Sequence, residues 1–238
     1  MRVDEENDFD GFITEDGTMI DIEDVESVSA LFLQATTVDD AVTTLRRLTS
    51  DCLDMGRLDA ARGYYEKILL LVDSPEEKAE CFLVIGGILE NLGKYREAEE
   101  TYARAFDLPQ ESNHDWYFLN NNRGYCLNQT GRHKEAAVFC LDAIRIDPER
   151  HNAYKNLGIA LMRLGRYAEA AQNLVRATEL CPADPRALAI LDEIYVGHRE
   201  RVREMPDFPA QLLRCHELVQ DEQKGKAECA SEQRAGNG

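Results

Sequence analysis

The side chains that most often carry out catalysis are scattered through this sequence and do not form a recognisable active site. The motifs of P-loop, dinucleotide-binding, nucleophile-elbow and H-E-x-x-H enzymes do not occur in the 238 residues. No histidine has a second residue at metal-ligand spacing among His114, His133, His151, His198 and His216. We therefore expect a protein that is not an enzyme and that uses no cofactor and no metal.

The seven cysteines also argue against a metal centre or a disulfide framework. They form no C-x-x-C pair, and most of them fall inside apolar helical patterns; they are Cys52, Cys81, Cys126, Cys140, Cys181, Cys215 and Cys229. Disulfides persist mainly in oxidising compartments, so this distribution favours small buried thiols in a reducing one. We expect a cytoplasmic protein.

Three consecutive asparagines suggest hydrogen bonding to a ligand or to a neighbouring helix. They lie in the stretch YFLNNNRGYCL, residues 117–127. An asparagine costs up to about 0.7 kcal/mol relative to alanine inside a helix, so three cost about 2 kcal/mol unless something compensates. A side-chain amide offers one acceptor and two donors, which match a peptide group whatever its side chain is.

The elements that carry these asparagines belong to an internal repeat. Four short strings recur at residues 54–61, 91–98, 129–136 and 163–170, and their glycines are spaced by 37, 38 and 34 residues. Each glycine, Gly56, Gly93, Gly131 or Gly165, follows one amphipathic helical pattern and precedes another. The pattern predicts a repeated helical hairpin whose turn needs a residue with positive φ.

This unit resembles the tetratricopeptide repeat, a helix-turn-helix of about 34 residues. The best copy is HNAYKNLGIALMRLGRYAEAAQNLVRATELCPAD at 151–184, which places Leu157, Gly158, Ala170 and Pro182 on the family pattern. Further copies occupy 42–75, 79–112 and 117–150. The first copy departs most, because Thr49 stands where the small glycine is usual, so we expect its hairpin to pack more loosely.

The resemblance implies an all-α fold, a right-handed α-solenoid of about four hairpins with a C-terminal capping helix. We expect an acidic flexible arm at 1–23 with a hairpin over FIT-EDG-TMI, a short helical lead-in at 24–41, the repeat domain at 42–184, capping helices at 185–222 and a disordered tail at 223–238. The arm only superficially resembles a calcium loop, because Gly17 stands where a bidentate glutamate is required. Thr37 and Asp40 are spaced as a capping box for the first repeat helix.

The resemblance also implies a concave groove, lined by the first helix of each hairpin, in which the family binds extended peptides. The predicted groove residues are Asn121, Asn122, Tyr125, Asn128, Asn152, Lys155, Asn156, Ile159 and Arg163. Asn122 and Asn156 share the sixth repeat position and resemble the asparagine ladder of the O-linked N-acetylglucosamine transferase repeats. The alternative is that these asparagines only bond a neighbouring helix, and the sequence leaves both open.

The charge of −18 is concentrated at the start of the chain, where residues 1–41 carry 13 acidic and 1 basic side chains. Such acidity disfavours nucleic acid and anionic lipid as partners. Purely apolar runs such as residues 68–72 are too short to span a membrane. We expect a non-catalytic adaptor, scaffold or chaperone for a protein or extended peptide, and Lys155 and Arg163 favour an acidic one. The alternative is a regulatory subunit of an enzyme.

Overall fold

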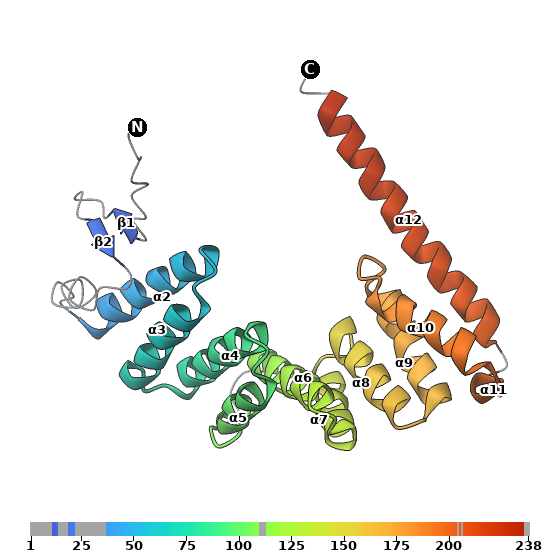
Figure 1. Ribbon diagram of the computed structural model, residues 1–238, viewed down its shortest axis with the longest axis horizontal. Coiled ribbons are helices and arrows are strands. Elements are labelled where there is room, and N and C mark those ends of the chain that lie inside the picture. Colours follow the sequence, from blue (N-terminus) through green and yellow to red (C-terminus); the bar gives the residue numbers. More distant parts are fainter. Residues whose placement is uncertain are drawn as a thin grey trace, which may run out of the picture. The chain divides into compact units, whose positions relative to one another are not determined.

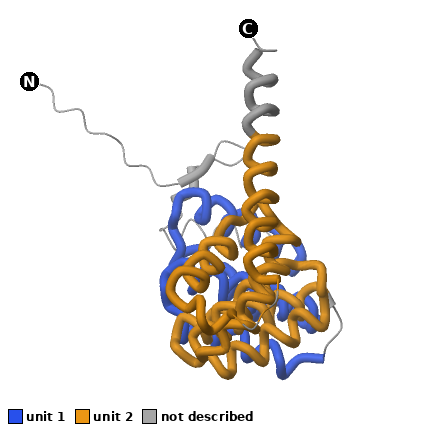
Figure 2. Tube along the Cα trace, turned by 90° about the vertical axis from the view of Figure 1, so that its right-hand side faces the viewer, with its two compact units in different colours: residues 1–111 blue, residues 112–238 orange. Residues whose placement is uncertain are grey.

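The structure is a computed structural model, which describes residues 11–13, 19–21, 37–109, 113–203, 205 and 207–235 (Figure 1). The chain divides into two compact units, residues 1–111 and 112–238, which are coloured separately in Figure 2. Apart from one short two-stranded sheet, the elements of the described residues are helices. The predicted all-α fold is therefore confirmed.

The short sheet lies in the acidic arm of the first unit. Strands β1 (Gly11–Ile13) and β2 (Met19–Asp21) pair antiparallel, with Phe12 opposite Ile20. The hairpin predicted at this place is confirmed. The remaining residues of the arm, and the predicted helical lead-in up to residue 36, lie outside the described residues.

Two helical hairpins make up the rest of the first unit. Helices α2 (Val38–Asp54) and α3 (Leu58–Leu71) form one, and α4 (Pro75–Asn91) and α5 (Tyr95–Ala105) form the other. The predicted capping box is present, since the Thr37 hydroxyl accepts from the Asp40 N–H and the Asp40 carboxylate accepts from the Thr37 N–H, both at 3.1 Å. The Ser74 hydroxyl caps α4 by accepting from the Glu77 N–H at 3.2 Å, and Pro75 is the first residue of the helix. Because these caps lie before the predicted repeat boundaries at 42 and 79, helices α2 and α4 each start four residues earlier than predicted.

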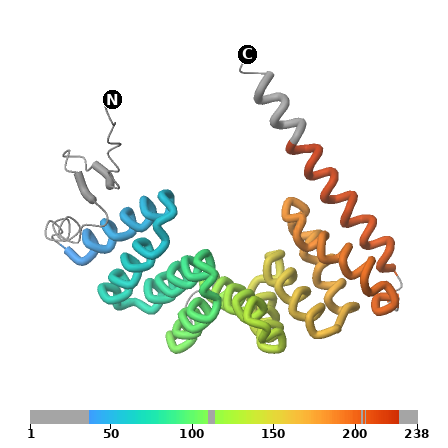
Figure 3. The backbone as a smooth tube through the Cα atoms, viewed as in Figure 1, coloured from blue at the N-terminus to red at the C-terminus, as the bar shows by residue number. Residues whose placement is uncertain are grey.

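The second unit continues the pattern with two more hairpins (Figure 3). They are α6 (Asn113–Gln129) with α7 (His133–Ile146) and α8 (His151–Arg163) with α9 (Tyr167–Leu180). Residues 113–116, which precede the predicted repeat boundary at 117, form the first turn of α6. The fourth repeat begins at His151, where it was predicted.

Each hairpin turns at the predicted glycine. Gly56, Gly93, Gly131 and Gly165 have φ of 72°, 71°, 79° and 76°, and no other described residue has positive φ. This left-handed conformation is strained for residues with a Cβ, which explains the glycine. The N–H after each glycine bonds back to the preceding helix, as in the 2.9 Å bond from Arg166 N–H to the Leu161 carbonyl.

A second kind of glycine lets the two helices of a hairpin approach closely. A Cβ added to Gly158 would lie 2.6 Å from Leu174 Cγ, and one added to Gly124 would lie 2.6 Å from Cys140 Sγ. This close approach explains why the eighth residue of the third and fourth repeats, Gly124 and Gly158, is a glycine. In the first hairpin the position holds Thr49, which is buried and donates its hydroxyl to the Leu45 carbonyl at 2.8 Å. Looser packing of that hairpin stays a prediction.

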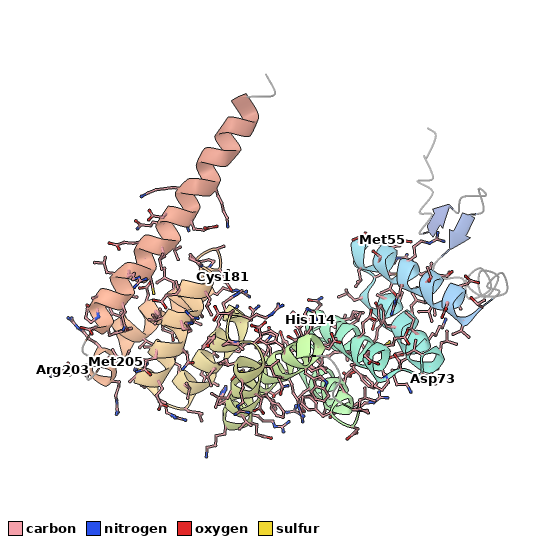
Figure 4. The ribbon with its side chains drawn as sticks, turned by 180° about the vertical axis from the view of Figure 1, so that it is seen from behind. Met55, Asp73, His114, Cys181, Arg203 and Met205 are labelled. Atoms are coloured by element: carbon pink, nitrogen blue, oxygen red, sulfur yellow. The ribbon has the colours of Figure 1, made fainter. Side chains whose placement is uncertain are left out.

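Three further helices cap the second unit: α10 (Arg186–Gly197), α11 (Arg199–Val202) and α12 (Phe208–Ala235). Helix α12 joins the core of this unit through four buried side chains at helical spacing, Phe208, Leu212, Cys215 and Val219. Figure 4 marks Met205, also buried, in the turn that leads into α12.

The disordered tail predicted for 223–238 is wrong for residues 223–235, because α12 continues to Ala235. Most of these residues are good helix formers, and only Gly225 is a poor one. Ion pairs at helical spacing join Lys224 to Asp221 at 3.6 Å and Lys226 to Glu222 at 3.4 Å. The polar composition that suggested disorder is therefore also compatible with an exposed helix.

The described cysteines fit the prediction of buried thiols. Cys52, Cys81, Cys126, Cys140 and Cys215 are buried and outside any disulfide, and Cys181 is likewise not in a disulfide but partly exposed. Burial raises the pKa of Cys140 to about 12 and that of Cys215 to about 11. These thiols stay protonated near neutral pH, so they are poor nucleophiles and poor metal ligands.

Candidate functional site

The predicted groove residues lie on α6 and α8, the first helices of the two hairpins in the second unit, which pack against each other. We call this set the α6–α8 face. Four of its members are buried: Asn121, Asn128, Lys155 and Asn156. Asn122, Tyr125, Asn152 and Ile159 are half-buried, and Arg163 is exposed. The face therefore has a buried polar layer beneath a set of more accessible side chains.

The buried asparagines form a hydrogen-bond network between α6 and α8. Asn156 Nδ2 donates to Asn121 Oδ1 at 3.0 Å, and Asn121 Nδ2 donates to Asn122 Oδ1 at 2.9 Å. Asn128 Nδ2 donates to the Asn156 backbone carbonyl at 2.8 Å, and its Oδ1 lies 3.1 Å from His133 Nδ1. The Asn128 amide nitrogen is already a donor to a carbonyl, so its oxygen accepts and His133 carries the proton on Nδ1. The network explains why polar side chains are tolerated between two helices.

The remaining asparagine of the triplet has a different partner. Asn120 is 4% exposed, and its Nδ2 donates to the Trp116 carbonyl one turn earlier at 2.8 Å. This local bond satisfies part of a side chain that would otherwise be costly to bury. Within the triplet, Asn120 bonds its own helix, Asn121 bonds the neighbouring helix, and Asn122 is half-buried.

Lys155 differs from the expectation that it faces a ligand. Its Nζ donates to Asp184 Oδ2 at 2.8 Å and to Asn152 Oδ1 at 3.3 Å, and only 7% of its side chain is exposed. Asp184 also accepts from Arg186 Nε at 2.7 Å and lies 3.4 Å from His151 Nε2. The prediction of Lys155 as a cation available for an acidic peptide is wrong, because a carboxylate of the chain already occupies it.

Three residues of this site were not predicted from the sequence: Asp184, Arg186 and His133. Asp184 comes from the connection between α9 and α10, just beyond Cys181, which Figure 4 labels at the end of α9. The available signal was the Asp-Pro-Arg triplet at 184–186, where an aspartate stands just before a helix start. The periodicity of one helix shows which of its residues share a face, but not which residues of another element contact that face.

The pKa shifts follow from these contacts. The guanidinium of Arg186 and the ammonium of Lys155 hold the pKa of Asp184 far below its usual range. Burial lowers the pKa of His151, and the charge of Lys155 lowers it further. Burial likewise lowers the pKa of His133, with a smaller effect from Arg163. Both imidazoles are therefore harder to protonate in the folded protein than in the unfolded chain.

These two histidines predict a loss of stability in mild acid. A folded-state pKa below the unfolded value of 6.5 means that the unfolded chain binds the proton more readily as pH falls through this range. The melting temperature should therefore drop by roughly a few degrees between about pH 7.5 and 5.5. A His133→Gln/His151→Gln variant, melted over the same range, should lose most of this dependence. An unchanged pH slope in the variant would contradict the assignment.

The accessible part of the face combines apolar, amide and cationic groups. Tyr125 and Ile159 offer apolar surface, Asn122 offers an amide, and Arg163 a guanidinium. Arg163 is exposed, and its charge contributes to lowering the pKa of His133. Such a mixture is suited to binding an extended peptide and has no nucleophile paired with a base.

Among the described residues, no group of three or more His, Cys, Asp or Glu side chains is placed to hold a metal ion. None of the helices described is both long enough and apolar enough to cross a bilayer.

Comparison with known proteins identifies the repeat. The family model described as tetratricopeptide repeat matches residues 151–184, and a second model of the same description matches 83–151. The small glutamine-rich tetratricopeptide repeat-containing protein 2 of Mycosarcoma maydis is 33% identical over 112 residues, which cover 47% of this chain and 31% of that protein. The TPR repeat-containing thioredoxin TTL4 of Arabidopsis thaliana is 34% identical over 110 residues, which cover 45% of this chain and 15% of that protein. The matched segment thus spans about a third or less of these relatives.

Solved structures show the same fold at low sequence identity. MamA from Desulfovibrio magneticus RS-1 is similar with a TM-score of 0.61 and 18% identity, covering 76% of this chain and 98% of that one. YrrB is similar with a TM-score of 0.55 and 19% identity, and the match covers 82% of this chain and 96% of that one. The structure agrees with the family-model matches, because its hairpins turn at glycines and their helices pack closely at Gly124 and Gly158. Residues 83–184 of the chain are therefore identified as tetratricopeptide repeats.

Proposed function

We propose that this chain is a non-catalytic protein-interaction module that binds an extended segment of a partner protein on the α6–α8 face. The observation that carries the proposal is the combination of a buried polar network with more accessible side chains on that face. The buried bond between Asn121 and Asn156 joins the two helices, and Asn122, Tyr125 and Ile159 of the same face are half-buried. A binding surface held by buried contacts loses little conformational freedom when a ligand arrives.

The chemistry of the accessible residues suits a peptide without a defined secondary structure. An asparagine amide can pair with the N–H and C=O groups of a peptide backbone, while Tyr125 and Ile159 can cover an apolar side chain. Arg163 can pair with an acidic side chain at the end of α8. YrrB, which shares the fold, is described as a TPR protein with an unusual peptide-binding site, and we extend peptide binding to this chain as part of the proposal.

An adaptor, scaffold or chaperone role follows if the bound segment belongs to a separate protein. The free thiols favour a reducing, cytoplasmic setting for such an interaction. The −18 net charge disfavours nucleic acid and anionic membranes as the partner. A partner that is itself an enzyme, present in stoichiometric amount, would define the chain as a regulatory subunit.

A matched pair of arginine substitutions tests the proposal. Ile159→Arg places a bulky charge on the α6–α8 face, whereas Val138→Arg makes the same kind of change at a site on α7 that is 55% exposed. Affinity capture with mass spectrometry should recover a common protein with wild type and Val138→Arg but lose most of it with Ile159→Arg. Circular dichroism must show that both variants fold. Equal recovery by all three proteins would reject the α6–α8 face as the binding site.

A further inference from the structure

A cluster formed by Lys155, Arg186 and His151 surrounds a single carboxylate, that of Asp184. Lys155 Nζ lies 2.8 Å from Asp184 Oδ2, and Arg186 donates to both carboxylate oxygens at 2.7 Å. His151 Nε2 also lies close to this carboxylate, 3.4 Å from Asp184 Oδ2. Donors from α8 and from the start of α10 thus converge on one anion, a geometry typical of carboxylate recognition.

The burial of this cluster is uneven. The side chains of Lys155 and Asp184 are 7% and 11% exposed, whereas that of Arg186 is 69% exposed. A buried ammonium is strongly destabilising without an anionic partner, so Lys155 requires a carboxylate at this position. Two permanent cations face one permanent anion, so the cluster keeps a positive excess even with its internal partner.

The cluster adjoins the α6–α8 face, because Lys155 belongs to both and donates to Asn152 of that face at 3.3 Å. Asp184, however, lies in the five-residue connection of residues 181–185 between α9 and α10. A group tethered by so short a segment reaches its site at an effective concentration on the order of millimolar or higher. A carboxylate from another molecule at micromolar concentration therefore does not displace it.

We propose that His151, Lys155 and Arg186 form a carboxylate-binding site that Asp184 occupies from within the chain, and that Asp184 thereby sets the specificity of the adjoining face. The consequence for the partner rests on the proposed function. With this site filled, the face has no buried cation for the carboxyl terminus of a ligand. It selects an internal segment, bound through Asn122, Tyr125 and Ile159, with Arg163 as the exposed cation for an acidic side chain.

The test removes the internal carboxylate and supplies a small one from solution. Melting temperatures of the full chain are compared in sodium formate and in sodium chloride at the same concentration. Wild type should show no formate-specific change, because Asp184 fills the site. Asp184→Ala should melt roughly 10 °C lower in chloride and recover a few degrees in about 0.2 M formate. Adding Lys155→Met, which keeps the apolar stem without the ammonium, should abolish the recovery.

These melts require no partner, so their failure is distinguishable from failure of the proposed function. A folded Asp184→Ala protein that does not respond to formate would overturn the proposal, as would a formate response that survives Lys155→Met. If Asp184→Ala does not fold, the isosteric Asp184→Asn takes its place in a double-mutant cycle with Lys155→Met. The two changes together should then lower the melting temperature less than the sum of the single changes. Strict additivity would also overturn the proposal.

Discussion

Gly158→Val is expected to lower the melting temperature of the second unit by roughly 10 °C, because it forces a side chain into the closest helix contact of the fourth hairpin. A Cβ at this position would lie 2.6 Å from Leu174 Cγ and 3.3 Å from the Ala170 carbonyl oxygen. The Leu174 side chain is fully buried and the Ala170 oxygen belongs to the backbone, so neither has room to move. Gly158→Ala should give a smaller loss in the same direction.

Gly87→Ala is the matched control for this packing effect. Gly87 is also a helical glycine, but a Cβ there meets nothing within 4 Å. Since alanine is the better helix former by about 1 kcal/mol, this change should raise the melting temperature slightly. Thermal melts followed by circular dichroism measure all three variants. A Gly158→Val protein that melts like wild type would show that the two helices of the hairpin are not in the described contact.

Asn156→Ala is expected to destabilise the protein by about 1–3 kcal/mol, because it leaves a buried oxygen without its donor. Asn156 is 5% exposed, and its Nδ2 makes the 3.0 Å bond to Asn121 Oδ1 that joins α8 to α6. The higher helix propensity of alanine returns only a few tenths of a kcal/mol. Urea unfolding should therefore show a lower midpoint for Asn156→Ala.

Asn122→Ala separates structural support from ligand binding. Asn122 is half-buried and accepts one bond from Asn121 within the same helix. We expect a smaller loss of stability than for Asn156→Ala, and a loss of partner affinity of roughly 5- to 150-fold if its amide bonds a peptide backbone. The reverse ranking, with Asn156→Ala the more stable protein, would mean that the network between the helices does not contribute as described.

The hairpin architecture was predictable because its signals are local. A residue with φ near 75° after a helix is almost always glycine, and the spacing of Gly56, Gly93, Gly131 and Gly165 therefore marks each turn. The capping box at Thr37 and Asp40 is equally local. Helix α12 beyond residue 222 was not predicted, since its polar sequence has no apolar stripe to detect.

The candidate site was only partly predictable, because its decisive contacts join distant residues. Periodicity places Asn121, Asn122, Lys155 and Asn156 on one side of their helices, but it does not show which of them a neighbouring element covers. Asn121 and Asn156 meet across 35 positions, and Lys155 meets Asp184 across 29. Which asparagine supports the fold and which is accessible therefore depends on tertiary packing.

The central claim is that a partner segment binds on the α6–α8 face. Calorimetric titration of the captured partner into wild type, Val138→Arg and Ile159→Arg tests it most directly, with folding of each protein checked by circular dichroism. We predict that Val138→Arg binds with the wild-type Kd and that Ile159→Arg binds at least about 100-fold more weakly, a loss of roughly 2.7 kcal/mol. An Ile159→Arg protein that is folded and binds with the wild-type Kd would contradict the claim.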